Sequence, residues 1–201
     1  TKEMIDPVRF ISNESSGKQG YAIAETLQSL GAKTTLVSGP TNLTRPNVER
    51  VINVESADQM LEACESSLPA DIAVCAAAVA DYKIANKEIA KIKKDGSRQN
   101  IILEENPDIL ERLSKRNHLR PKLVVGFAAE TSNLERNSNE KLNKKGCDWV
   151  LGNNVSENSI FNQDTNKIYF TSKLYSENWE LMTKKEVAKK LCQKISLHLT
   201  N

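Results

Sequence analysis

Short apolar runs alternate with amphipathic segments in the first part of the chain, and this alternation constrains the fold more than any other feature. Compact apolar or alternating runs predict strands, and apolar side chains spaced by three and four residues predict helices. The predicted strands are residues 8–11, 34–38, 50–54 and 71–80. The predicted helices are residues 20–30, ending at Gly31, and a segment with a capping box of Ser56 and Gln59 that ends before Pro69. Such alternation is typical of a parallel sheet covered by helices.

The rest of the chain continues the alternation and adds an antiparallel edge. Buried strands are predicted at 123–127 and 147–151, and antiparallel strands at 167–170 and 179–182. The predicted helices open at Asn106-Pro107, at a second capping box of Ser132 and Glu135, and at Thr183 with Glu186. The run Lys91–Lys94, the turn Asp95-Gly96 and the segment Gln99–Leu103 predict an exposed hairpin arm. The predicted fold is α/β, with a Rossmann-like, mostly parallel sheet flanked by helices, an antiparallel edge and a protruding hairpin arm.

Length and composition set further bounds. The 201 residues predict a single domain over 1–201, with a possible flap at 83–104. A formal charge of +2 gives no electrostatic argument for a nucleic-acid partner. The four widely spaced cysteines match neither a zinc site nor a disulfide framework, and this favours a reducing, cytoplasmic setting. No apolar run is long enough to predict a membrane span.

A run of small residues at the end of one predicted strand is the first candidate site. Cys75-Ala76-Ala77-Ala78-Val79-Ala80 is followed by Asp81, and three lysines arrive at Lys91–Lys94. Small side chains leave room for a flat ligand against the backbone, and a carboxylate with nearby cations suits a nucleotide. The alternative interpretation, a core strand followed by a solvated basic loop, is equally compatible with these residues alone.

A polar loop before the first predicted helix is the second candidate. Residues 12–20 carry serine hydroxyls, Gly17, Lys18 and Gly20, and free N–H groups at a helix N-terminus bind anions. The loop is not a P-loop, because Gln19 stands where Ser or Thr is required, and it lacks a full dinucleotide fingerprint. A simple helix cap is the commoner role of such a loop.

Taken together, these segments resemble phosphopantothenate–cysteine ligase (phosphopantothenoylcysteine synthetase), the ligase domain of the bacterial bifunctional protein of coenzyme A biosynthesis. The resemblance spans most of the chain in the family's order. It rests on Asp6–Asn13, Ser15–Lys18, Ala76–Tyr82, Lys91–Lys94, Asn106–Ile109 and Val125–Thr131. Family members usually begin with a further strand and a Gly-rich turn before the segment that opens here at Thr1, so the sheet is expected to be one strand short.

The resemblance implies a two-step ligation. The carboxylate of 4′-phosphopantothenate attacks the α-phosphate of CTP and expels pyrophosphate, and the amine of L-cysteine then attacks the acyl-cytidylate and releases CMP. Mg²⁺ is implied beside the triphosphate, with its protein ligands unassigned. The resemblance further implies a homodimer and a possible fusion to a flavin-dependent decarboxylase.

The same resemblance implies a set of site residues. Asn13 and Lys91 are the catalytic candidates. The nucleotide candidates are Cys75, Ala76, Ala77, Asp81, Lys91, Pro107, Asp108, Ile109, Leu110, Phe127, Lys141 and Lys145. The substrate candidates are Arg9, Asn13, Ser16, Gly17 and Lys18. From spacing alone, Lys141 and Lys145 form a solvated helix face.

Two other functions remain open at this point. An NAD(P)-dependent oxidoreductase can use a Rossmann-like sheet, because the fold does not fix the function. The glycine fingerprint of that class is incomplete here. A non-catalytic nucleotide-binding module is the second alternative.

Overall fold

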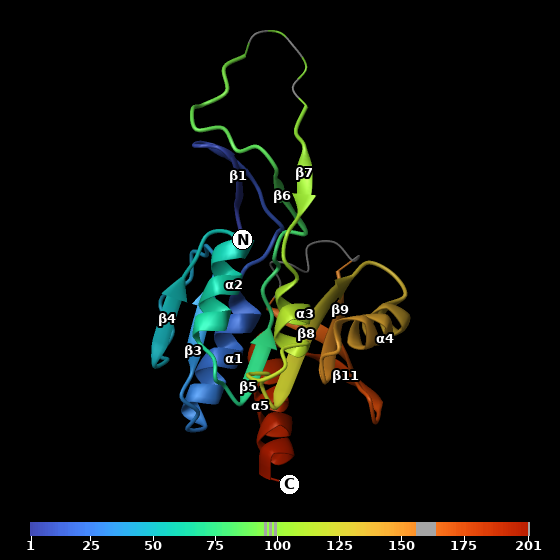
Figure 1. Ribbon diagram of the computed structural model, residues 1–201. Coiled ribbons are helices and arrows are strands. Elements are labelled where there is room, and N and C mark those ends of the chain that lie inside the picture. Colours follow the sequence, from blue (N-terminus) through green and yellow to red (C-terminus); the bar gives the residue numbers. More distant parts are fainter. Residues whose placement is uncertain (95, 97, 99, 156–163, 201) are drawn as a thin grey trace.

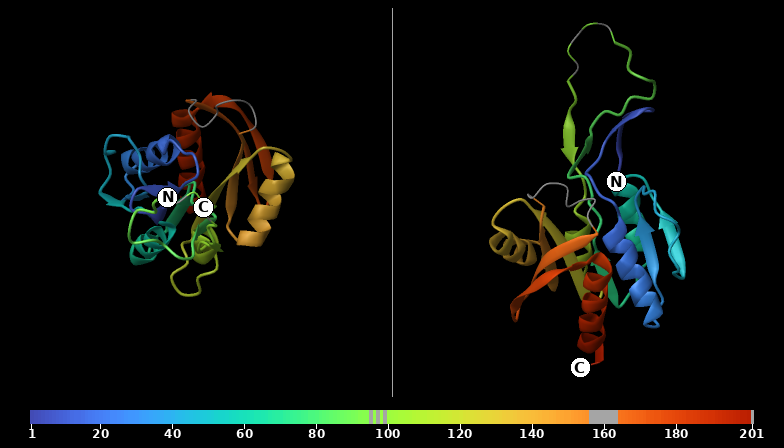
Figure 2. Two further views of the ribbon diagram at one scale, coloured as in Figure 1. Left: turned by 90° about the horizontal axis from the view of Figure 1, so that it is seen from above. Right: turned by 180° about the vertical axis from the view of Figure 1, so that it is seen from behind.

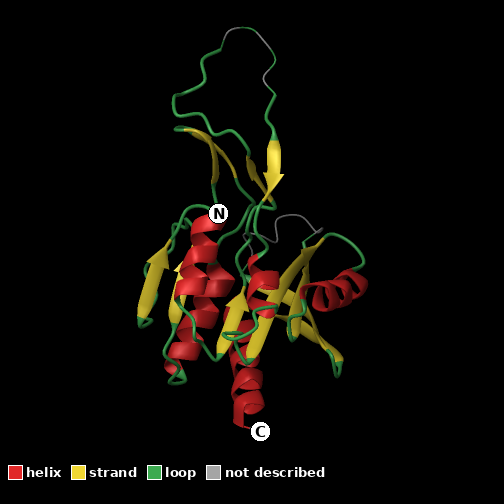
Figure 3. Ribbon diagram, viewed as in Figure 1, coloured by secondary structure: helices red, strands yellow, loops and turns green. Residues whose placement is uncertain are grey.

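The centre of the computed structural model is a mixed five-stranded sheet in the order β11-β10-β9-β8-β5 (Figure 1, Figure 3). The structure describes residues 1–94, 96, 98, 100–155 and 164–200. The strands of this sheet are β5 (Ile72–Cys75), β8 (Leu123–Glu130), β9 (Trp149–Asn154), β10 (Thr165–Ser172) and β11 (Ser176–Thr183). Strands β5, β8 and β9 are parallel, and β10 pairs antiparallel with both of its neighbours. The predicted α/β class with an antiparallel edge is therefore confirmed.

Helices cover both faces of the sheet (Figure 2). They are α1 (Lys18–Ser29), α2 (Ala57–Ser66), α3 (Ile109–Ser114), α4 (Leu134–Lys145) and α5 (Lys184–Thr200). Successive residues of β8 face opposite cores, as the period of a strand requires. Val125 packs in the core that includes α5, and Val124 packs in the core that includes Leu110 of α3 and Leu142 of α4. Within the described ranges, every helix is too short or too polar to cross a bilayer.

The N-terminal strands do not join the central sheet. Strands β1 (Glu3–Asp6) and β2 (Arg9–Ile11) form an antiparallel hairpin, whereas β3 (Thr35–Ser38) and β4 (Arg50–Asn53) pair in parallel with each other. In the described part of the chain, β3 and β4 form a sheet of their own and β5 is an edge strand. The alternation of elements correctly predicts that β3 and β4 are strands. The prediction that they belong to one continuous sheet with β5 is wrong.

A long arm, whose described residues are 83–94, 96, 98 and 100–104, projects beyond the carboxyl edge of the central sheet (Figure 1). Its base is the antiparallel pair β6 (Tyr82–Ile84) and β7 (Leu103–Glu105). The protruding hairpin is confirmed, but Lys91–Lys94 lie in irregular chain rather than in a strand. Asp95 and Gln99, which belong to the predicted turn and returning strand, lie outside the described residues.

Several predicted boundaries need correction. The strand predicted over 71–80 ends at Cys75, the last residue of β5 that pairs with β8. Helix α3 is capped by Asp108, whose carboxylate accepts from Glu111 N at 2.8 Å, rather than by Asn106. The capping box of Ser132 and Glu135 does not form, because α4 follows Asn133, which has a φ of 50°.

Two other capping boxes are confirmed. Ser56 accepts from Gln59 N, and the Gln59 side chain accepts from Ser56 N, at the start of α2. Before α5, Thr183 Oγ1 accepts from Glu186 N at 3.2 Å, and Glu186 Oε2 accepts from Thr183 N at 2.7 Å. Such reciprocal pairs satisfy backbone N–H groups that a helix start leaves unpaired.

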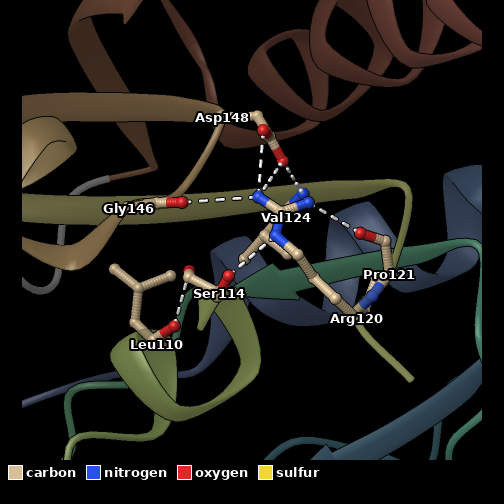
Figure 4. A network of polar contacts seen from close by, with 7 residues as sticks. All are labelled: Leu110, Ser114, Arg120, Pro121, Val124, Gly146 and Asp148. Carbon is tan, nitrogen blue, oxygen red and sulfur yellow. Dashed lines mark hydrogen bonds and ion pairs between the residues drawn. The ribbon is translucent and has the colours of Figure 1, made fainter. Parts of the chain in front are cut away.

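Arg120 ties together the amino-terminal edge of the sheet (Figure 4). Its guanidinium donates to both carboxylate oxygens of Asp148, at 3.0 and 2.9 Å, and to the carbonyl oxygens of Ser114, Pro121 and Gly146. Asp148 Oδ2 also accepts from Val124 N at 2.7 Å, so a single ion pair fixes the starts of β8 and β9. This edge lies opposite the arm.

We expect Arg120→Met to lower the free energy of unfolding by about 2–3 kcal/mol, because it leaves a half-buried carboxylate unpaired. Urea denaturation followed by circular dichroism measures the change. Arg136→Met is the matched control, since Arg136 forms an exposed i,i+4 pair with Glu140 and its loss should cost less than about 0.5 kcal/mol. Equal stability losses in the two variants would contradict the role given to Arg120.

Candidate functional site

The carboxyl ends of β5 and β8 lie side by side, because Cys75 pairs with Gly126. From the last residue of β5 onward the chain forms a segment of mostly small side chains, residues 75–80, which is called the wall from here on. Ala80, the last residue of the wall, is buried, whereas Ala77 is exposed. Ligands of open α/β sheets bind at this edge, outside the carboxyl ends of parallel strands. The structure thus places the predicted small-residue wall where a ligand can reach it.

The first turn of α1 passes close to the wall. A Cβ atom placed on Gly20 would lie 3.9 Å from the Cβ of Ala76. Gly17 caps the helix with a φ of 72°, and a Cβ there would lie 2.7 Å from Thr41 Cγ2, so this position requires glycine. The loop containing Ser16, Gly17 and Lys18 therefore adjoins the wall. The Lys18 ammonium pairs with the exposed Asp164 at 2.7 Å.

Two asparagine side chains donate to backbone carbonyl groups of the wall. Asn13 Nδ2 donates to Val79 O at 3.0 Å, and Asn106 Nδ2 donates to Ala80 O at 2.9 Å. The Asn106 backbone N–H also donates to Asp81 O at 2.8 Å. Asn106 Oδ1 is buried and has no hydrogen-bond partner among the described residues. Buried acceptors normally have a hydrogen-bond partner, so this oxygen is an exception in the described part of the chain.

A charged group lies beside the wall. Lys145 forms an ion pair with Asp108, and Glu111 Oε2 lies 3.9 Å from the same ammonium. Burial alone would raise the pKa of Asp108, but hydrogen bonds from Lys145 and Glu111 N hold it below its usual value. The hydrogen bond to Asp108 raises the pKa of Lys145, so both groups stay charged near neutral pH. The predicted nucleotide residues Asp108 and Lys145 are thus in direct contact.

Lys141 reaches the same place from one turn earlier in α4. Its ammonium donates to Phe127 O at 2.7 Å, in β8 directly after Gly126. The helix therefore presents Lys141 and Lys145 to the sheet edge rather than to open solvent. The solvated helix face predicted from the spacing of these two lysines is therefore wrong.

Four other nucleotide candidates are partly or fully buried. Leu110 and Ile109 are both buried, in different cores, and a Cβ on Gly126 would lie 2.6 Å from Leu110 Cδ2. Phe127 is half-buried, and so is Pro107, which directly precedes the Asp108 cap. These residues pack next to the carboxyl ends of β5 and β8.

Lys91 lies on the arm, directly before Ile92. Its side chain is exposed and has no hydrogen-bond or ion-pair partner in the described ranges. Arg9, a predicted substrate residue, donates from its guanidinium to the buried Asp6 carboxylate and, at 2.8 Å, to Ile92 O. Direct binding of substrate by Arg9 and catalysis by Lys91 both remain predictions.

The cysteines are poorly suited to nucleophilic chemistry. Burial raises the pKa of Cys75 to about 12 and that of Cys64 to about 11. The pKa of Cys147 is likewise raised to about 11 and that of Cys192 to about 12. Thiols with such pKa values stay protonated at neutral pH, and only the thiolate is a good nucleophile. Among the described residues, no three His, Cys, Asp or Glu side chains have the arrangement of a metal site.

Two residues that matter to this geometry were not among the candidate site residues of the sequence. Asp6 precedes Pro7 in a turn, and its burial could be suspected only from an acidic residue in an apolar hairpin. Asn106 was interpreted as a helix cap, a common role of asparagine before proline. In the structure its Nδ2 donates to Ala80 O of the wall, and its buried Oδ1 has no partner among the described residues.

Comparisons with known proteins identify the family of the chain. The family model described as "DNA/pantothenate metabolism flavoprotein C-terminal domain" matches residues 1–198. The coenzyme A biosynthesis bifunctional protein CoaBC of Haemophilus influenzae is 43% identical over 97% of this chain and 49% of its own length. A crystal structure of the C-terminal domain of CoaBC is 37% identical, with a TM-score of 0.80, over 100% of this chain and 91% of the other.

A more distant structural neighbour shares the fold alone. A variant of Cab2 in complex with phosphopantothenate-cysteine is 16% identical, with a TM-score of 0.72, over 100% of this chain and 86% of the other. The chain spans about half the length of the curated relative it matches. With a family model that covers nearly every residue, the chain belongs to the DNA/pantothenate metabolism flavoprotein C-terminal domain family.

Proposed function

We propose that this chain joins 4′-phosphopantothenate to L-cysteine at the expense of CTP, through a 4′-phosphopantothenoyl-cytidylate. One observation carries the proposal: the wall, Asn13 and the Asp108–Lys145 and Lys141 group converge at one edge of the sheet. Family membership points to the same chemistry, since the Haemophilus influenzae relative is a coenzyme A biosynthesis protein. The Cab2 variant with the same fold binds phosphopantothenate-cysteine.

The proposed chemistry requires no nucleophilic side chain. A carboxylate oxygen of 4′-phosphopantothenate forms a bond to the α-phosphorus of CTP as the bond to pyrophosphate breaks. The cysteine amine then bonds to the acyl carbon, CMP leaves with the electron pair of the acyl–oxygen bond, and the nitrogen loses a proton. Protonated cysteines near the wall fit this scheme, because they do not compete for the activated acyl group.

Charge neutralisation is the main task left to the protein. Positioned cations and hydrogen-bond donors stabilise the charge that crowds around phosphorus during the first step. Lys91 is proposed for that role, with Lys141 and Lys145 at the nucleotide and the loop of Ser16, Gly17 and Lys18 at substrate phosphate. Mg²⁺ prefers phosphate oxygens with one or two carboxylates, and Asp81 offers one at the end of the wall.

The arm is proposed to act as a flap and to contribute to a homodimer. Apolar side chains are exposed along it and along the neighbouring β1–β2 hairpin: Val8, Phe10, Tyr82, Ile89, Ile101, Ile102 and Leu103. Apolar groups gathered on one projection are typical of a surface that another chain covers. We further propose that residues 1–201 act as one ligase domain in the cytoplasm. In a longer protein, a flavin-dependent decarboxylase would precede it.

A ligation assay tests the proposal. With Mg²⁺, CTP, 4′-phosphopantothenate and L-cysteine, the protein should release CMP and pyrophosphate in equal amounts and form the amide product, which mass spectrometry detects. Nucleotide binding without turnover would support a non-catalytic module instead. Oxidation of NAD(P)H without CTP consumption would support the oxidoreductase, and either result would contradict the ligase.

A further inference from the structure

Asp6 is a fully buried carboxylate at the end of β1. Its Oδ1 accepts from Val8 N and Arg9 N, each at 2.9 Å. Its Oδ2 accepts from Arg9 Nε at 2.9 Å, from Arg9 Nη2 and from Ile92 N at 3.1 Å. The Ile92 contact lies far along the chain from Asp6, on the arm. A buried charge is tolerated only when its oxygens are satisfied in this way.

Asp6 and Arg9 together bind both the N–H and the carbonyl oxygen of Ile92, and this pair of contacts is called the Asp6–Arg9 hold. While Asp6 accepts the Ile92 N–H, Arg9 Nη2 donates to the Ile92 carbonyl oxygen at 2.8 Å. The planar fork of arginine allows it to reach a carboxylate and a carbonyl group together, which a lysine ammonium does less well. Burial alone would raise the pKa of Asp6, but the hydrogen bonds from Arg9 and from backbone N–H groups keep it well below its usual value. The pair therefore stays ionised throughout the neutral range.

We propose that Asp6 and Arg9 are positioning residues for Lys91, because they fix the peptide of Ile92, its immediate neighbour. This inference rests on the proposed function, in which Lys91 supplies the cation for carboxylate activation. The arm has another attachment to β1, where Glu88 N donates to Ile5 O at 3.0 Å. Ile92 lies nearer to Lys91 than Glu88 does, so the Asp6–Arg9 hold decides where the lysine backbone is placed.

The first test measures the hold without any activity assay. Hydrogen exchange at the Ile92 amide, followed by NMR on the whole chain, should speed up at least about tenfold in Asp6→Asn and in Arg9→Lys. The Val124 amide, which bonds to Asp148 at the opposite edge, should exchange as in the wild type if the fold is intact. Asp58→Asn is the matched control, since Asp58 pairs with Lys83 at the base of the arm and does not touch Ile92.

The second test asks whether the hold acts through Lys91. In pyrophosphate exchange, Asp6→Asn should lower kcat about tenfold and change the KM for CTP less than about twofold. Added to Lys91→Gln, it should lower the rate by less than about twofold more, because the two residues would serve one interaction.

Two outcomes overturn the proposal. One is unchanged Ile92 exchange in Asp6→Asn, and the other is a full further loss of rate in the double variant. A wild-type protein without pyrophosphate exchange would refute the proposed function, and the amide measurement would still decide whether Asp6 and Arg9 hold the Lys91 segment.

Discussion

Replacing Lys91 by glutamine is expected to slow the exchange of labelled pyrophosphate into CTP about a hundredfold. The assay contains Mg²⁺, CTP and 4′-phosphopantothenate but no cysteine, so it reports carboxylate activation alone. Lys91 is exposed on the arm and lacks a protein partner among the described residues, so its charge is available to a ligand. A positioned contact to the crowded phosphorus is worth on the order of 3 kcal/mol, which is the source of the expected factor.

Two lysines serve as controls for the Lys91 substitution. Lys94 is exposed on the same stretch of the arm, and Lys122 pairs with Asp71 on the surface at the opposite edge of the sheet. Glutamine at either position should change exchange less than about threefold, because solvated charges are screened.

A loss well under tenfold for Lys91→Gln would show that this lysine is simply solvated. Exchange that required cysteine would refute the acyl-cytidylate route. Exchange with ATP as fast as with CTP would overturn the choice of nucleotide.

The fold was predictable where local patterns decide it. Buried runs such as 123–127 and capping boxes such as Ser56 with Gln59 depend on residues close together in the sequence, and both are found in the structure. Pairing between strands depends on residues far apart, and nothing in 34–38 or 50–54 indicates that β3 and β4 stand apart from β5. The wall was predicted as strand because it is apolar and directly continues the run 71–74, yet its backbone accepts hydrogen bonds from asparagine side chains instead.

The candidate site shows the same division. Small residues followed by Asp81 and by the lysines of Lys91–Lys94 favour a nucleotide, whereas the charged residues that the structure gathers beside the wall are Asp108, Lys141 and Lys145. The resemblance, rather than spacing, supplied those two lysines. The hold of Asp6 and Arg9 on Ile92 could not be predicted, because it joins segments that no local pattern relates. Long-range side-chain contacts of this kind become visible only once the chain is folded.

Asn13→Ala is expected to separate the two steps of the reaction. Asn13 is exposed, and its Nδ2 donates to Val79 O at 3.0 Å, which fixes the amide against the wall. The amide oxygen is then left to accept a hydrogen bond from the bound intermediate or from the incoming amine. Its removal should leave the binding of CTP nearly unchanged, since Asp108, Lys141 and Lys145 stay in place.

The measurement compares ligation with pyrophosphate exchange in Asn13→Ala. Overall ligation should fall roughly 100-fold, the lower end of the cost of removing one positioned transition-state hydrogen bond. The Kd for CTP, from calorimetry, should change less than about twofold, since that hydrogen bond is not made to the nucleotide. Asn117→Ala is the control, because Asn117 is exposed in the loop after α3, away from the wall.

If pyrophosphate exchange persists while ligation falls, Asn13 acts on the use of the intermediate. If both rates fall together, Asn13 acts on the formation of the intermediate. An unchanged ligation rate would remove Asn13 from the active site, and its bond to Val79 would then serve only to close the loop before α1.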